Sequence, residues 1–176
     1  MRRKILQESE PTRKHGKMQI TLGLENAELK LMPINLLRPH ENVDLKILNR
    51  LIESIESDGV LKRGIVIDRK TYVILDGHHR VKALEILNCD KVPCLLIDYS
   101  SPQVLVSPWR GEGLISKSLI IKAGLTGRLL PPKTSKHMLL LGGCMVHISV
   151  VEPEVNIPLS MLRAEFPSLG YRQKEQ

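Results

Sequence analysis

Aromatic residues are scarce in this sequence, and cysteines are few. Phe, Trp and Tyr make up 3% of the 176 residues, so Leu, Ile and Val must build the core. The three cysteines (Cys89, Cys94 and Cys144) are an odd number and include no CxxC pair. They fit reduced, mostly buried thiols better than a disulfide framework or a zinc site.

Long apolar runs are missing as well. No run reaches the roughly 18 residues that a membrane-spanning helix needs, so we expect no association with a membrane. Residues 1–17, MRRKILQESEPTRKHGK, hold neither a long apolar stretch nor a small-residue cleavage site, so we expect no secretory signal. We therefore expect a cytoplasmic protein with one domain, or with one domain and a modest extension.

The net charge of +7 is concentrated at one end of the chain. Residues 1–17 contain six basic and two acidic side chains, which leaves a charge of only +3 on the remaining 159 residues. Nucleic-acid-binding domains usually carry a basic face on the folded part, so we do not expect nucleic acid as a partner. We interpret residues 1–28 as a basic tail.

Two common phosphate-binding motifs, GxxxxGK[ST] and GxGxxG, do not occur, and there is no internal repeat. Instead, β-rich and helix-like segments alternate along the chain. Apolar spacing predicts strands at about 29–32, 64–75 (a hairpin with its turn at 68–70) and 91–98, and helices at 45–58, 79–88 and 114–124. This order predicts a compact α+β fold.

Several glycines and prolines add to this assignment. Gly59 follows the helix at 45–58 as a C-terminal cap, and Gly124 is interpreted as the end of the helix at 114–124. Pro93 favours an edge position for its strand. Residues 100–113 are predicted as a connection, followed later by a loop at 131–137, two strands separated by Gly142-Gly143, and a short helix within 157–166.

The most informative stretch is VILDGHHRVKALEIL, residues 73–87, where a strand ends in Asp-Gly and a helix begins at once. The first N–H groups of such a helix lack partners within the helix and favour an anion. Gly77 lets a ligand approach the backbone closely, and Arg80 offers a fork of donors suited to phosphate. A neighbouring carboxylate, Asp76, completes the combination that phosphoryl transfer needs.

Alternatives to this interpretation remain open. Asp76 could simply cap the helix, with Arg80 as an exposed charge. Zinc binding by His78 and His79 is less favoured, because adjacent histidines diverge on a helix and point to opposite faces on a strand.

Two further stretches carry polar side chains suited to chemistry. In RPHEN, Glu41 follows His40 in a loop before a helix, a suitable place for a general base. In PPKTSKH, residues 133–137 offer consecutive donors suited to a carboxylate or a phosphate. Taken alone, each stretch could equally be an exposed loop, the first acidic and the second basic.

The stretch DGHHR, followed by VKALEILN and KVPCLLIDY, resembles the ParB/sulfiredoxin-like superfamily, whose nucleotide lies on a G-x-x-R turn. Within it, the chain is most similar to the free L-serine kinases of archaea and bacteria. Three blocks carry the resemblance: LLRPHE with the helix end ESIESDGV, then ILDGHHR, then PPKTSKHML, which together span about residues 31–141. The resemblance implies a ParB-like nucleotide-binding core at 29–100 and a small C-terminal α/β extension at 101–176 that binds the substrate.

The resemblance also implies roles for individual residues. Glu41 is expected to take the proton from the serine hydroxyl, and Asp76 to lie close to the transferred phosphoryl group and its Mg²⁺, the other metal ligands being unassigned. The residues expected to bind nucleotide are Ser54, Gly59, Val60, Gly77, His78, His79 and Arg80. Those expected to bind the amino acid or the product phosphate are Trp109, Lys133, Thr134, Ser135, Lys136 and His137.

The implied reaction converts L-serine and a nucleotide into O-phospho-L-serine, a step towards cysteine. The donor is ATP or ADP, with ATP favoured, and the oligomeric state is not implied. The chain departs from some relatives in having Ser135 and Lys136 in place of Thr and Arg, and in a short segment between Trp109 and Pro131.

Other members of the superfamily have different activities. The main alternative is a ParB-type nucleotide switch or DNA-partition module. That function needs a helix-turn-helix after the nucleotide fold, and the sequence after Asp98 does not predict one. A sulfinic-acid reductase would need a cysteine in the turn, and a nuclease would need a cluster of acidic metal ligands.

Overall fold

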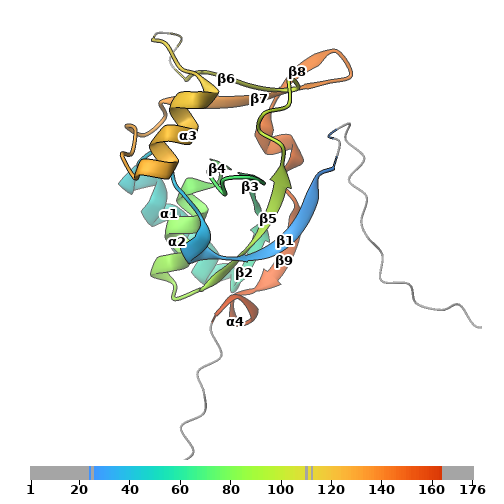
Figure 1. Ribbon diagram of the computed structural model, residues 1–176. Helices are drawn as coiled ribbons and strands as arrows, with labels where there is room; N and C mark the ends of the chain where they lie inside the picture. The colour runs from blue at the N-terminus through green and yellow to red at the C-terminus, as the bar shows by residue number, and fades with distance from the viewer. Residues whose placement is uncertain (1–23, 25, 110, 112, 164–176) are drawn as a thin grey trace, which may run out of the picture.

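The computed structural model describes residues 24, 26–109, 111 and 113–163 (Figure 1). Most of the predicted basic tail lies outside the described residues. The described part of the chain combines a four-stranded sheet, a three-stranded sheet and a two-stranded sheet with helices. Among these residues, no helix has the length and apolar character that crossing a bilayer requires.

The four-stranded sheet has the order β1-β5-β3-β4. β5 (Lys91–Ile97) lies antiparallel to β1 (Glu28–Pro33) and parallel to β3 (Ile65–Asp68), and β3 forms a hairpin with β4 (Ile74–Asp76). These strands lie where the sequence predicted them, and the hairpin turn is at 69–71 instead of 68–70. β4 therefore ends at the turn that the sequence singled out.

The prediction of an edge position for Pro93 is wrong, because β5 is an inner strand. Pro93 pairs with Leu31 of β1, whereas pairing with β3 begins one residue later, at Cys94 opposite Ile65. Proline is tolerated here because its missing N–H lies just before the parallel ladder and breaks none of its bonds.

Helices α1 (Leu45–Asp58) and α2 (His78–Ile86) pack against each other and against one face of this sheet (Figure 1). The start of α1 is set by Asp44, whose carboxylate accepts from the backbone N–H groups of Lys46 (2.8 Å) and Ile47 (3.2 Å). Its end is set by Gly59, which has a left-handed φ of 66° as the sequence predicted.

Alternate residues of the sheet enter two different cores, because successive side chains of a strand point to opposite faces. Ile65 and Ile67 pack with α1 and α2, whereas Val66 packs in the second core with residues of the C-terminal half. The second core is formed where the four-stranded sheet packs against α3 (Lys117–Thr126) and the three-stranded sheet.

The three-stranded sheet corrects two predictions. Its order is β6-β7-β8, with β6 (Val104–Pro108) inside the stretch that was predicted as a connection. β7 (Ser135–Leu141) takes in the end of the predicted loop, and β8 (Cys144–His147) follows the two glycines as expected. The start of β7 was missed because its inward-facing side chains include Ser135 and His137, which are polar.

The prediction that Gly124 ends a helix is also wrong. α3 continues to Thr126 and ends at Gly127, which has a left-handed φ of 67°. Gly124 is buried inside the helix, and a Cβ added to it would lie 2.6 Å from Cγ2 of Val73. Glycine is needed there for close approach of α3 to the sheet, not for a turn.

The chain finally returns to the first half of the fold. After the 3-10 helix η2 (Ile148–Val151), strand β9 (Glu154–Pro158) pairs antiparallel with β2 (Val60–Arg63), and neither strand was predicted. A short helix, α4 (Leu159–Leu162), lies inside the segment 157–166, and the end of that segment is outside the described residues. The division into 29–100 and 101–176 stays a prediction.

Candidate active site

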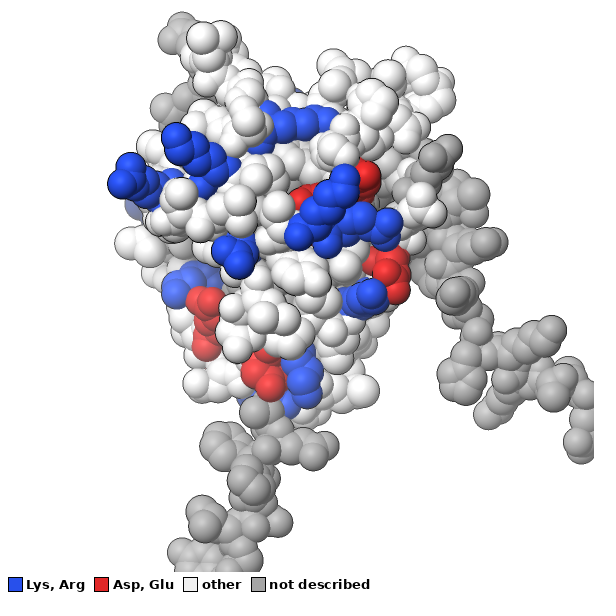
Figure 2. Space-filling model, viewed as in Figure 1, with Lys and Arg blue, Asp and Glu red and all other residues white. Residues whose placement is uncertain are grey.

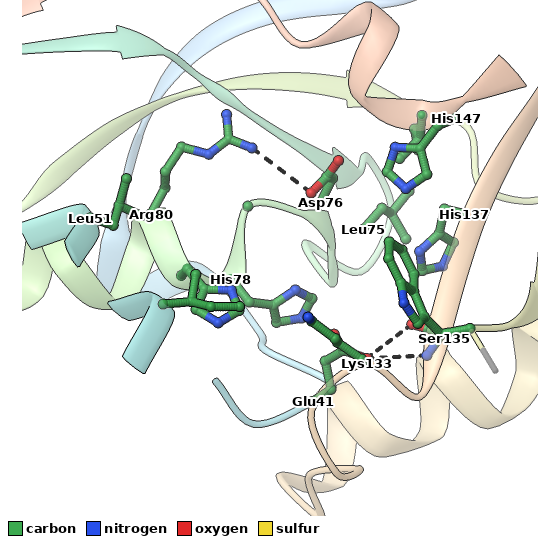
Figure 3. A pocket seen from close by; sticks show the side chains of 15 residues that line it. Glu41, Leu51, Leu75, Asp76, His78, Arg80, Lys133, Ser135, His137 and His147 are labelled. Carbon is green, nitrogen blue, oxygen red and sulfur yellow. Dashed lines mark hydrogen bonds and ion pairs between the residues drawn. The ribbon is translucent and has the colours of Figure 1, made fainter. Parts of the chain in front are cut away.

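A cavity of about 310 Å³ lies where the β4–α2 turn, the loop before α1 and strand β7 meet (Figure 3). Many of the residues that the sequence singled out line it, although they come from four separate parts of the chain. They are Glu41, Asp76, Gly77, His78, His79, Arg80, Trp109, Lys133, Ser135 and His137.

The turn between β4 and α2 requires glycine. Gly77 has a φ of 103°, and a Cβ added to it would lie 2.4 Å from Cγ2 and 2.8 Å from Cβ of Ile65, a fully buried residue of β3. Helix α2 begins at the next residue, His78. The N–H groups of its first turn therefore lie at the wall of the cavity, where they favour an anion.

Arg80 is held in place by two partners from distant parts of the chain. Its guanidinium donates to the carboxylate of Glu152 and to the carbonyl of Gly64, and it lies 3.8 Å from Oδ1 of Asp76. Burial, and after it the charge of Glu152, raises the pKa of Asp76 to about 6. Glu152 follows η2 and belongs to no motif, so the sequence did not indicate it.

Asp76 is the residue here that fits a bound cation. Its Oδ2 is buried and has no hydrogen-bond partner among the described residues. Such an oxygen suits Mg²⁺, which prefers carboxylate ligands and phosphate oxygens. No group of three or more His, Cys, Asp or Glu in the described part of the chain is arranged to hold a metal by itself.

Glu41 is brought to the cavity by its loop, which pairs with Leu130 in the segment before β7. Its Oε2 accepts hydrogen bonds from the backbone N–H of Ser135 (3.3 Å) and from the hydroxyl of Ser135 (3.2 Å). Burial is the largest influence on this carboxyl and raises its pKa, although these hydrogen bonds oppose the shift. A partly buried carboxylate with a raised pKa suits the role of a general base.

Three buried histidines form a cluster next to Glu41. The rings of His40 and His78 meet edge to face, with centroids 4.4 Å apart, and His137 lies 5.6 Å from His40. Burial lowers the pKa of all three, to about 4 for His40 and about 3 for His137, so they are neutral near pH 7. Both ring nitrogens of His40 already have partners, Ile74 O (2.7 Å) and Ser135 Oγ (2.8 Å), so it is not free to bind a metal.

His79 has a contact of its own at the start of α1. Its Nε2 lies 3.0 Å from the backbone N–H of Asp44, and an N–H can only donate. Nε2 is therefore the acceptor, and the neutral ring carries its proton on Nδ1. The Nδ1–H group is what this side chain has left for a phosphate.

Trp109 lines the cavity and contacts two further side chains. Trp109 meets the ring of His147 edge to face (5.9 Å between centroids), and the ammonium of Lys136 lies 5.7 Å from the Trp109 ring. His147 also lines the cavity, which the sequence did not indicate. Lys136 and Thr134 do not line it, and the hydroxyl of Thr134 donates to Pro131 O (2.7 Å).

A second pocket of about 290 Å³ adjoins the first, and Leu51 and Arg80 line both. Ser54 and Val60 line the second pocket, together with the apolar side chains of Ile55 and Leu61, whereas Gly59 lines neither pocket and ends α1. A flat apolar group placed here would have the Arg80 guanidinium between itself and the first cavity.

Comparison with known families identifies the fold. Residues 13–107, more than half of the chain, match the ParB N-terminal domain family. The chain belongs to this family. The ParB-like turn predicted at Gly77–Arg80 lies within the matched residues.

Several curated relatives match parts of the chain. A ParB-like protein of Sulfolobus acidocaldarius is 42% identical over 86 residues, which are 49% of this chain and 43% of that protein. An ATP-dependent L-serine kinase of Staphylothermus marinus is 33% identical over 92 residues (50% and 36%), and an ADP-dependent L-serine kinase of Thermococcus kodakarensis is 32% identical over 77 residues (42% and 32%). The matched part of the chain spans less than half the length of each of these relatives.

Solved structures extend the likeness beyond the matched family region. A free serine kinase in complex with AMP has a TM-score of 0.64 at 16% identity and covers 82% of this chain and 97% of that one. A mutant free serine kinase in complex with ADP has a TM-score of 0.63 at 16% identity and covers 76% and 93%. At this identity the likeness shows the fold, and it confirms the predicted α+β fold with a ParB-like domain.

Proposed function

We propose that the protein is a kinase that transfers a phosphoryl group from a nucleotide to the hydroxyl of free L-serine, giving O-phospho-L-serine. The observation that carries the proposal is the arrangement of one small cavity. Asp76 and Arg80 lie at one end of it, and Glu41, which pairs with no Lys or Arg of the described residues, lies at the other (Figure 3). The names of the L-serine kinases to which the chain is similar support the same activity.

The two adjoining pockets suit the two halves of a nucleotide. The second pocket, with its apolar wall of Leu51 and Ile55, would take the nucleoside. The phosphates would then pass Arg80 and reach the first turn of α2, where backbone N–H groups and the guanidinium neutralise their charge. ATP is the donor we propose, and ADP is the alternative.

The acceptor hydroxyl would lie between Glu41 and the terminal phosphate. Its oxygen forms a bond to phosphorus, the bond from phosphorus to the nucleotide oxygen breaks, and the hydroxyl proton passes to the Glu41 carboxylate. Lys133 and Trp109, on the rim of the same cavity, would orient the amino acid. Holding the reactants in this geometry supplies much of the rate of such a reaction.

Asp76 would hold a Mg²⁺ bound to the phosphates, because its Oδ2 is buried without a partner among the described residues. When bound, Mg²⁺ neutralises negative charge on the transferred phosphoryl group. Arg80 beside it offsets the negative charge of Asp76 and Glu152.

The second candidate is a ParB-type nucleotide switch, which is favoured by the family match and by the relative named as a ParB-like protein. Such a protein needs a basic face for DNA. On the face shown in Figure 2, basic side chains lie in separate groups, several of them beside acidic ones.

One experiment separates the two candidates. The full chain is incubated with Mg²⁺, L-serine and either ATP or ADP, and phosphoserine is measured, with the Glu41→Gln variant as a control. The kinase proposal expects phosphoserine with at least one donor and almost none from the variant. Nucleotide binding without phosphoserine from either donor would leave the switch as the better interpretation.

A further inference from the structure

Ser135 stands between two hydrogen-bond acceptors. Its Oγ lies 3.2 Å from Oε2 of Glu41 and 2.8 Å from Nε2 of His40. A serine hydroxyl has a single proton, so it can donate to only one of them at a time. The residue is buried at the start of β7, which fixes the position of the oxygen while leaving the O–H free to rotate.

The proton position on His40 follows from its other contact. Nδ1 lies 2.7 Å from the carbonyl oxygen of Ile74, and a carbonyl oxygen can only accept. The proton of the neutral ring is therefore on Nδ1, and Nε2 is an acceptor that faces Ser135. Since His40 is completely buried, no water competes for this position.

We propose that Ser135 is a hydrogen-bond switch for the general base Glu41, with His40 as the second acceptor. When Glu41 is ionised, the Ser135 hydroxyl donates to it. After Glu41 has taken the proton of the acceptor alcohol, its new O–H donates to Ser135 Oγ, and the Ser135 hydroxyl rotates to donate to His40 Nε2. No covalent bond of Ser135 or His40 forms or breaks.

This arrangement supplies a partner for both protonation states of Glu41 without moving a heavy atom. Without His40, the Ser135 proton would lose its second acceptor and would stay directed at Glu41. The carboxylate would then be held in its ionised form and would be a poorer base. Ser135 and His40 are therefore positioning residues, and their role rests on the proposed function of Glu41.

Other groups around Glu41 are the same in each variant used to test the switch. The backbones of Lys133, Thr134 and Ser135 face the carboxylate and favour its ionised form. The titratable or charged side chains that line the cavity from other elements are Asp76, His78, His79, Arg80, Lys133, His137 and His147. None of the variants changes these groups, so a difference between the pH profiles of two variants reports the effect of the substitution.

The test measures phosphoserine formation against pH in four proteins. Ser135→Ala removes the donor to the ionised carboxylate, so the acid limb of kcat/KM should move to higher pH. His40→Asn keeps an amide N–H for Ile74 but removes the second acceptor, so the limb should move to lower pH. Both should reduce kcat by about tenfold, because Ser135→Ala leaves the new O–H of Glu41 without an acceptor and His40→Asn leaves Glu41 a poorer base. Ser135→Thr keeps the hydroxyl and should behave like the wild type.

Shifts in opposite directions, with rescue by Ser135→Thr, are the signature that a merely structural role would not give. Shifts in the same direction, or a threonine variant as impaired as the alanine variant, would overturn the switch. Should His40→Asn not fold, the Ser135→Ala and Ser135→Thr pair still decides. If the wild type makes no phosphoserine, the proposed function fails, and NMR titration of the ¹³C-labelled Glu41 carboxyl in the same proteins tests the switch alone.

Discussion

Gly77→Ala should destabilise the protein far more than Gly59→Ala. Both glycines have a positive φ, and each directly follows a helix or a strand. At Gly59 (φ 66°) an added Cβ meets nothing within 4 Å. At Gly77 (φ 103°) it would lie 2.4 Å from Cγ2 and 2.8 Å from Cβ of Ile65. Cβ of Ile65 is fixed to the backbone of an inner strand, so the contact cannot be relieved by a side-chain rotation.

The magnitude follows from two contributions. A positive φ for alanine costs about 1–3 kcal/mol at either position, and overpacking a core adds about 1–3 kcal/mol at Gly77 only. Alanine also restricts the unfolded chain equally in both variants, so this effect cancels in the comparison. The two free energies of unfolding should therefore differ by about 1–3 kcal/mol.

Urea unfolding followed by circular dichroism measures this difference, and nucleotide titration of the folded variants complements it. Gly77→Ala should also weaken nucleotide binding, because relief of the contact shifts the first turn of α2, whereas Gly59→Ala should not. Equal free energies of unfolding for the two variants would refute the claim that close approach to Ile65 requires glycine in this turn.

Three other outcomes are expected. Glu41→Gln should lower kcat by about 10²–10⁴-fold, with nucleotide affinity unchanged in a binding titration, because it removes only the base; near wild-type turnover would exclude Glu41 from the mechanism. Arg80→Ala should raise the nucleotide Kd by at least about tenfold, or ~1.4 kcal/mol, and an unchanged Kd by calorimetry would contradict the assigned phosphate site. In wild-type kcat/KM measured against pH, activity should fall as the pH drops through the pKa of Glu41. Because burial raises this pKa, the acid limb should lie above the range of an ordinary glutamate. An acid limb at or below that range would argue against Glu41 as the base.

The part of the site that the sequence predicted is the part encoded locally. Strand β4, the turn and helix α2 follow each other without interruption, so Gly77 and Arg80 could be placed from spacing alone. The ends of α1 were also predictable, because Asp44 and Gly59 act within their own turns. Which residues bind which ligand stays a prediction.

The missed features depend on pairing between distant segments. Glu152 meets Arg80 only because η2 and β9 bring residues 148–158 back to β2. Gly124 was interpreted as a helix end because its neighbour Val73, far away in sequence, was not known. The start of β7 was missed for a different reason. Its first two inward-facing side chains, Ser135 and His137, are polar, so the sequence there does not alternate between apolar and polar residues.

The two ends of the cavity differ in charge, and burial explains the difference. At the Arg80 end, the first N–H groups of α2 favour phosphate, and the guanidinium offsets the negative charges of Asp76 and Glu152. At the Glu41 end, the neighbouring rings of His40, His78 and His137 are neutral, because burial lowers their pKa. If those rings were charged, they would stabilise the carboxylate and make it a weaker base. Neutral histidines supply contacts and hydrogen bonds without this effect, so the same cavity can attract phosphate at one end and keep a basic carboxylate at the other.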